Sequence, residues 1–96
     1  MVKNFEMDVE GKTVTAVEVA LPGAPLVLVA AAKGFVMCGY LSVEAAAKLG
    51  VAAVRVRGVK TVDDLLKAPV DSASEAALQL GVTAGMLGRD ALKKLL

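Results

Sequence analysis

Cys38 is the only cysteine of the chain and lies in a nearly uncharged segment, LVLVAAAKGFVMCGYL, at residues 26–41. A cysteine becomes a nucleophile or a metal ligand when it is exposed and nearby cations lower its pKa. The cations that could do so here are Lys33, Arg57 and Lys60. Free cysteine is also among the residues most often buried, and we favour a core position for Cys38 as the simpler interpretation.

Gly39 and Tyr40 follow Cys38 directly and keep a binding role open for this segment. A glycine inside an expected strand often marks a bulge, or a point at which a ligand approaches the backbone closely. A reactive thiol would need a partner segment that supplies positive charge, and the sequence RVRGVKTVDD at residues 55–64 is one.

Lys60 and Thr61 in that second segment directly precede an expected helix. The first N–H groups of a helix and its dipole favour an anion, and Arg57 could add charge. Asp63 and Asp64 open the same helix and could satisfy those N–H groups instead. We therefore favour an ordinary helix cap over an anion site.

The chain contains no histidine, which excludes several kinds of chemistry within one chain. Histidine is the commonest general base near neutral pH and the commonest transition-metal ligand, and both the Ser-His-Asp and the Cys-His arrangements require it. A single cysteine also rules out a four-thiolate zinc site in one chain. No phosphate-binding or dinucleotide-binding glycine motif is present. We expect no cofactor and no metal.

Composition limits the class of protein further. The length of 96 residues predicts one domain, residues 1–96, and 56% of the residues are apolar, above the usual share for globular chains. A subunit interface is the simplest cover for that surplus, so we expect a homo-oligomer. Net charge is +1 and aromatic residues make up 3%. The sequence therefore has neither the excess of basic residues nor the aromatic residues that nucleic-acid-binding proteins use, and we expect no nucleic-acid partner. The chain has one asparagine and one glutamine, which suits a thermostable protein.

Residues 19–43 carry one charge and are long enough to span a membrane as a helix. Prolines and glycines interrupt them, however, so we expect strands and turns there and no membrane span. The charged, alternating N-terminus MVKNFEMDVE differs from a secretory signal, so we expect a cytoplasmic location.

The patterning predicts an α+β domain of N-terminal antiparallel strands followed by short helices. Alternation at residues 5–10 and β-branched residues at 13–21 predict a hairpin, and residues 26–32 and 35–41 predict two further strands. Ser42 is expected to cap a helix over 43–49, which leads to a strand at 51–57 and makes a mixed sheet possible. Thr61 and Ser72 are expected to cap two more helices, the second ending at Gly81, and residues 89–96 form the last.

The chain resembles the YunC-like family of small bacterial and archaeal proteins, a class of unknown function. The resemblance rests on MCG at residues 37–39, GVKTVDDLLKAPV at 58–70 and GMLGRDAL at 85–92, and it extends over almost the whole chain. It implies an intracellular α+β domain. It implies no activity, substrate or catalytic residue.

Two functions follow as hypotheses. The first is a homo-oligomeric binding or interaction domain. The alternative is a histidine-free enzyme, or a small-ligand (anion) binder, in which the cysteine segment and the Gly58–Thr61 loop meet in a pocket. The candidate binding residues are Cys38, Gly39, Tyr40, Arg57, Lys60 and Thr61.

Overall fold

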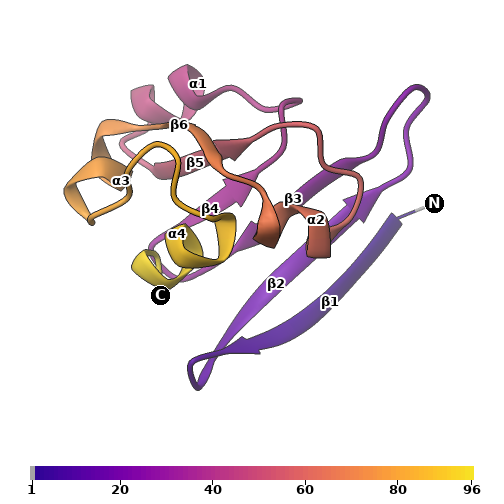
Figure 1. The fold of residues 1–96 in the computed structure, drawn as a ribbon, viewed down its shortest axis with the longest axis horizontal. Helices are drawn as coiled ribbons and strands as arrows, with labels where there is room; N and C mark the ends of the chain where they lie inside the picture. Colours follow the sequence, from indigo (N-terminus) through magenta and orange to yellow (C-terminus); the bar gives the residue numbers. More distant parts are fainter. Residues whose placement is uncertain (1) are drawn as a thin grey trace.

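A computed structural model describes residues 2–96, which form one six-stranded mixed sheet with four short helices (Figure 1). The α+β class predicted from the sequence is therefore confirmed, and the sheet is mixed, which the sequence had left as a possibility. The elements in chain order are β1 (Val2–Val9), β2 (Lys12–Val19), β3 (Leu26–Ala30), β4 (Gly34–Met37), α1 (Val43–Lys48), β5 (Ala52–Val56), α2 (Val62–Lys67), β6 (Val70–Ala73), α3 (Glu75–Gln79) and α4 (Gly88–Lys94).

The strands lie side by side in the order in which they occur in the chain. The first four strands pair antiparallel, each with the next. Helix α1 then carries the chain back along the sheet, so β4 and β5 pair parallel, and β6 pairs antiparallel with β5. The carboxyl ends of β4 and β5 consequently lie side by side at one end of the strands. The beginning of β3 lies beside the end of β4.

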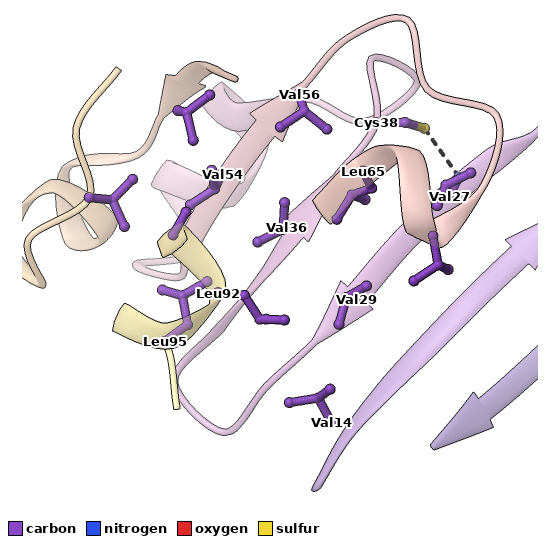
Figure 2. Packing of buried hydrophobic residues seen from close by; sticks show 14 of the residues in the cluster. Val14, Val27, Val29, Val36, Cys38, Val54, Val56, Leu65, Leu92 and Leu95 are labelled. Carbon is purple, nitrogen blue, oxygen red and sulfur yellow. Dashed lines mark hydrogen bonds between the residues drawn. The ribbon is translucent and has the colours of Figure 1, made fainter. Parts of the chain in front are cut away.

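Helices cover both faces of the sheet. The main core fills the face under α2 and α4, where Val29, Val36 and Val54 lie opposite one another across three strands and pack with Leu65 and Leu92 of the helices (Figure 2). Residues adjacent to these in β4 and β5 point to the other face. There Met37 and Ala53 pack against Ala46 of α1 in a second, smaller cluster.

The turn chemistry explains the N-terminal hairpin. Glu10 and Gly11 connect β1 and β2 with φ angles of 50° and 80°. Two positive φ values in a two-residue loop are the combination whose twist matches that of the flanking strands. The predicted hairpin is confirmed, and its pairing continues without interruption from Val9 opposite Lys12 to Val2 opposite Val19.

Two helix caps expected from the sequence are present. The Ser42 hydroxyl accepts a hydrogen bond from the backbone N–H of Ala45 at 3.1 Å, and the Thr61 hydroxyl accepts one from Asp64 at 3.1 Å. Gly50 follows α1 with φ of 73°, the left-handed conformation expected after a helix end.

The expected cap at Ser72 is wrong. Ser72 lies in β6, a strand that the sequence patterns did not predict, and α3 begins later, with Ser74 as its N-cap. The Ser74 hydroxyl caps nothing in the helix, because it accepts the N–H of Ala53 at 2.9 Å and donates to the carbonyl of Val51 at 2.8 Å. Ser74 therefore fastens the chain to β5.

The segment from residue 19 to 43 forms strands and turns, as expected from its prolines and glycines. Strand β4 ends at Met37, earlier than the predicted end at residue 41, so Cys38 lies just beyond the strand. No helix within residues 2–96 is long and apolar enough to cross a membrane.

Candidate functional site

A pocket of about 320 Å³ lies beyond the carboxyl ends of β4 and β5. Cys38, Gly39 and Tyr40 follow β4, Gly58, Val59 and Lys60 follow β5, and Ala24 and Pro25 precede β3; these eight residues line the pocket. In sheets with parallel strands, ligands bind outside the carboxyl ends of those strands. The volume lies at the small end of the range for small-molecule sites.

Cys38 is one of the lining residues of this pocket. The residue is only 3% exposed, and its Sγ accepts a hydrogen bond from the backbone N–H of Val27 at 3.3 Å (Figure 2). The backbone N–H of Cys38 donates in turn to the Val27 carbonyl at 3.0 Å. The thiol therefore closes the last step of the pairing between β3 and β4. This position agrees with the core role that we favoured from the sequence.

Polar groups also belong to the segments that line the pocket. The Tyr40 hydroxyl donates to the Ala24 carbonyl at 2.9 Å and ties two of these segments together. Within residues 2–96, no protein acceptor takes the backbone N–H groups of Gly39, Tyr40 or Gly58, and Lys60 takes part in no ion pair. Among the described residues, the lining of this mainly apolar cavity thus includes one lysine outside any ion pair and three residues whose backbone N–H groups have no protein acceptor.

The start of α2, beside the pocket, is already satisfied by protein groups. The Glu18 carboxylate reaches across from β2 and accepts the N–H of Val62 at 2.9 Å. The Asp64 carboxylate accepts the N–H of Lys60 at 3.2 Å, and Thr61 caps the helix. An anion would have to displace these acceptors, so the helix start itself offers no anion site. Thr61 does not line the pocket.

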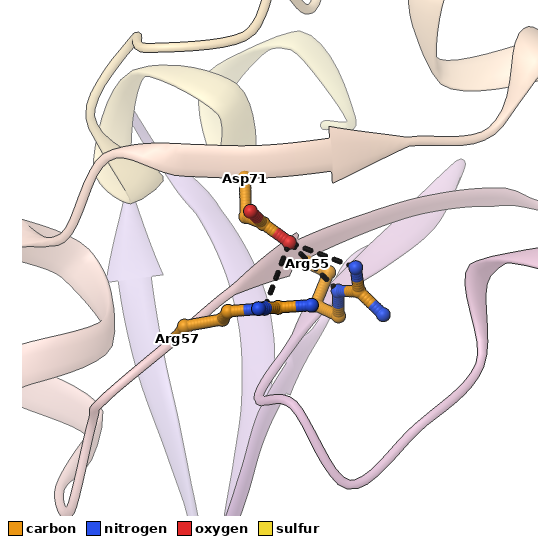
Figure 3. Close-up of polar contacts among 3 residues, drawn as sticks. All are labelled: Arg55, Arg57 and Asp71. Atoms are coloured by element: carbon orange, nitrogen blue, oxygen red, sulfur yellow. Dashed lines mark hydrogen bonds and ion pairs between the residues drawn. The ribbon is translucent and has the colours of Figure 1, made fainter.

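Arg57 points to a different partner. Its Nε lies 3.0 Å from Oδ2 of Asp71, and the same oxygen accepts Nε and a terminal nitrogen of Arg55 at 3.0 and 2.8 Å (Figure 3). Asp71 can reach both arginines because the pairing of β5 with β6 is irregular at this point. The Arg57 guanidinium is thus held beside Asp71 of β6, and Arg57 is absent from the pocket lining.

The structure therefore brings together four of the six candidate residues, namely Cys38, Gly39, Tyr40 and Lys60, and leaves Arg57 and Thr61 outside the lining. Their role in binding stays a prediction. Ala24 and Pro25 were not among the candidates. The proline-glycine turn before β3 was visible in the sequence, but its place beside Tyr40 follows only from the pairing of β3 with β4.

A second cavity of about 210 Å³ lies between α1 and the sheet. It is lined mainly by apolar side chains, among them Phe35, Met37, Leu41 and Leu49. No side chain in its lining carries charge, so it is an apolar gap beside the smaller core cluster. Within residues 2–96 no group of cysteine and acidic side chains could hold a metal ion.

Comparisons with known proteins support the family assignment over the whole chain. A family model described as Domain of unknown function (DUF1805) matches residues 37–95. The uncharacterized protein YunC of Bacillus subtilis (strain 168) is 42% identical over 100 residues, which cover 100% of this chain and 99% of the relative. A crystal structure of a protein of unknown function, TA1206 from Thermoplasma acidophilum, matches with a TM-score of 0.96 and 40% identity over 100% of this chain and 94% of that chain. The resemblance read from the sequence motifs is confirmed, and none of these descriptions assigns an activity.

Proposed function

We propose that this chain, which belongs to the DUF1805 family, is a binding protein that holds a small anionic molecule with an apolar body in the pocket at the ends of β4 and β5. The observation that carries the proposal is the meeting of Cys38–Tyr40 with Gly58–Lys60 around a cavity of about 320 Å³. The apolar lining suits the body of such a ligand, and Lys60 with the N–H groups of the lining residues suits its charge.

Benzoate is a suitable probe, because it combines one carboxylate with an apolar ring. In a titration followed by amide NMR, we expect benzoate to shift the signals of Gly39, Tyr40 and Gly58 in a saturable manner. Benzamide, which has the same shape without the charge, should bind two- to fivefold more weakly, since an exposed charge contact contributes up to about 1 kcal/mol.

Lys60→Met should remove the preference for benzoate over benzamide. Lys33→Met is the matched control, because Lys33 lies in the turn between β3 and β4, where its backbone N–H bonds to Leu95, and it does not line the pocket. Equal shifts spread over the whole surface without saturation would overturn the proposal. A benzoate preference that survives in Lys60→Met would overturn the part assigned to Lys60.

The alternative function, a histidine-free enzyme with Cys38 as nucleophile, makes the opposite prediction about the thiol. Because Cys38 is buried and bonded to the Val27 N–H, we expect a chromogenic disulfide to modify it at least about tenfold more slowly than in the unfolded chain. A rate above that of the unfolded chain would favour the enzyme and count against simple binding.

We further propose that the chain is a cytoplasmic, thermostable protein that acts as a homo-oligomer. The free, buried thiol suits a reducing compartment, and side-chain amides occur only at Asn4 and Gln79. A thermal melt followed by circular dichroism should give a midpoint above the roughly 45–65 °C of mesophile domains. A midpoint inside that range would remove thermostability from the proposal.

A further inference from the structure

The two edge strands of the sheet differ sharply in how they are protected. Strand β6 is four residues long, follows Pro69, and pairs irregularly with β5. Shortness, proline and bulges are the features by which proteins prevent an edge from pairing with another chain. Strand β1 is eight residues long, contains no proline, and pairs with β2 in unbroken register. Within residues 2–96, no other element lies along its free side (Figure 1).

The direction of the free backbone groups follows from the hairpin. A two-residue turn makes Val9 and Lys12 a hydrogen-bonded pair, and bonded and non-bonded pairs alternate along an antiparallel ladder. The odd residues from Lys3 to Val9 therefore bond to β2. The N–H and C=O groups of the even residues from Val2 to Asp8 point away from it, as an open template for another strand.

The side chains of β1 favour a second copy of the same strand. Phe5, Met7 and Val9 lie on the face of the main core, because Phe5 is opposite Ala16 and Met7 is opposite Val14. Met7 and Val9 are partly buried there, whereas Phe5 is 41% exposed at the border of the core. An apolar side chain at this place would be covered if the sheet continued beyond β1.

Symmetry restricts the register in which two copies can pair. Opposite residues of an antiparallel pair have their side chains on the same face of the sheet. A two-fold axis perpendicular to the sheet must therefore lie midway between the two copies of one residue, which then face each other. An axis at Glu6 places two carboxylates directly opposite each other, which is destabilising. An axis at Asn4 pairs only residues 2–6. An axis at Phe5 pairs residues 2–8 and places each Glu6 opposite an asparagine amide.

We propose that two copies of this chain associate through β1, antiparallel and centred on Phe5, to form one continuous twelve-stranded sheet. In this register each outward N–H and C=O from Val2 to Asp8 gains a partner. The two Phe5 rings meet at the axis as a non-hydrogen-bonded pair, the type in which side chains approach more closely. Met7 of each copy lies opposite Lys3 of the other, whose methylene groups can cover the Met7 side chain.

Charge exchange at Phe5 tests the interface. By sedimentation velocity at tens of micromolar, the wild-type chain should have twice its 9.8 kDa monomer mass. Phe5→Lys and Phe5→Glu should each be monomeric, because like charges then face each other at the axis, and an equimolar mixture of the two should dimerise again. Leu78→Lys is the matched control: Leu78 is 47% exposed on α3, far from β1, and its variant should remain dimeric (Figure 1).

A cysteine cross-link tests the register. In a Cys38→Ala background, Phe5→Cys should form a disulfide-linked dimer under mild oxidation, because residues opposite each other have Cβ atoms about 4.5–5.5 Å apart. Met7→Cys should not form one. In this register position 7 lies opposite position 3 of the other copy, so the two cysteines are four residues, about 13 Å, apart along the strands. A monomeric wild-type chain, a dimer indifferent to the Phe5 charges, or equal cross-linking at both positions would each overturn the proposal.

Discussion

Gly34→Ala is expected to lower the free energy of unfolding by about 3 kcal/mol or more, the upper range for overpacking. A Cβ added at Gly34 would overlap the carbonyl oxygen of Ala52 on β5 and lie 2.8 Å from the Ala52 Cβ. The obstacle is backbone of the neighbouring strand, which no change of side-chain rotamer can remove. Relief would require β4 and β5 to separate at the start of their parallel pairing.

Urea denaturation measures this effect, and Gly39→Ala is the matched control at the other end of the same segment. The nearest atom to a Cβ added there is Cγ of Arg57 at 4.0 Å, an ordinary contact. We expect this variant to unfold within about 1 kcal/mol of the wild type. Equal stability of the Gly34 and Gly39 variants would show that the two strands can separate without cost.

Ser74→Ala is expected to cost about 2–4 kcal/mol, because it deprives two backbone groups of their partner. The Ser74 hydroxyl accepts the N–H of Ala53 and donates to the carbonyl of Val51, and Ser74 is buried. A buried donor or acceptor left without a partner costs about 1–3 kcal/mol. The loss should also appear as faster hydrogen exchange at the Ala53 amide.

Ser72→Ala provides the control for this change, two residues away in the same segment. The Ser72 hydroxyl is buried and has no hydrogen-bond partner within residues 2–96. Removing it should leave stability unchanged or raise it slightly, because burial of an unpaired hydroxyl is unfavourable. If both serine variants lost the same stability, the two hydrogen bonds of Ser74 would not be the cause.

These two serines illustrate where sequence reasoning stops. Both precede the α3 region, and both have the local chemistry of a helix cap. Ser42 and Thr61 have the same chemistry and do cap their helices. The difference is that Ser72 lies in a strand and the Ser74 hydroxyl meets unsatisfied groups of β5, a segment about twenty residues earlier in the chain. No local pattern contains that contact.

For the candidate site too, one part could be predicted from the sequence and another could not. The pairing of Cys38, Gly39 and Tyr40 with the loop around Lys60 could be anticipated because a helix between two strands makes a parallel crossover available. Parallel pairing of β4 and β5 then places the two segments that follow them side by side. The absence of Arg57 from the pocket lining could not be anticipated, because Arg57 forms an ion pair with Asp71 instead. An irregularity in the pairing of β5 with β6 brings Asp71 within reach of Arg57.

Local chemistry in the sequence was sufficient to determine the N-terminal hairpin, the caps of α1 and α2 and the α+β class. Each of these depends on residues a few positions apart or on composition alone. Only the tertiary structure decided the pocket lining, the partners of Ser74 and Arg57, and which edge of the sheet remains open. Those features depend on strand order and register, which arise from contacts between distant segments and leave no periodic signal in either segment.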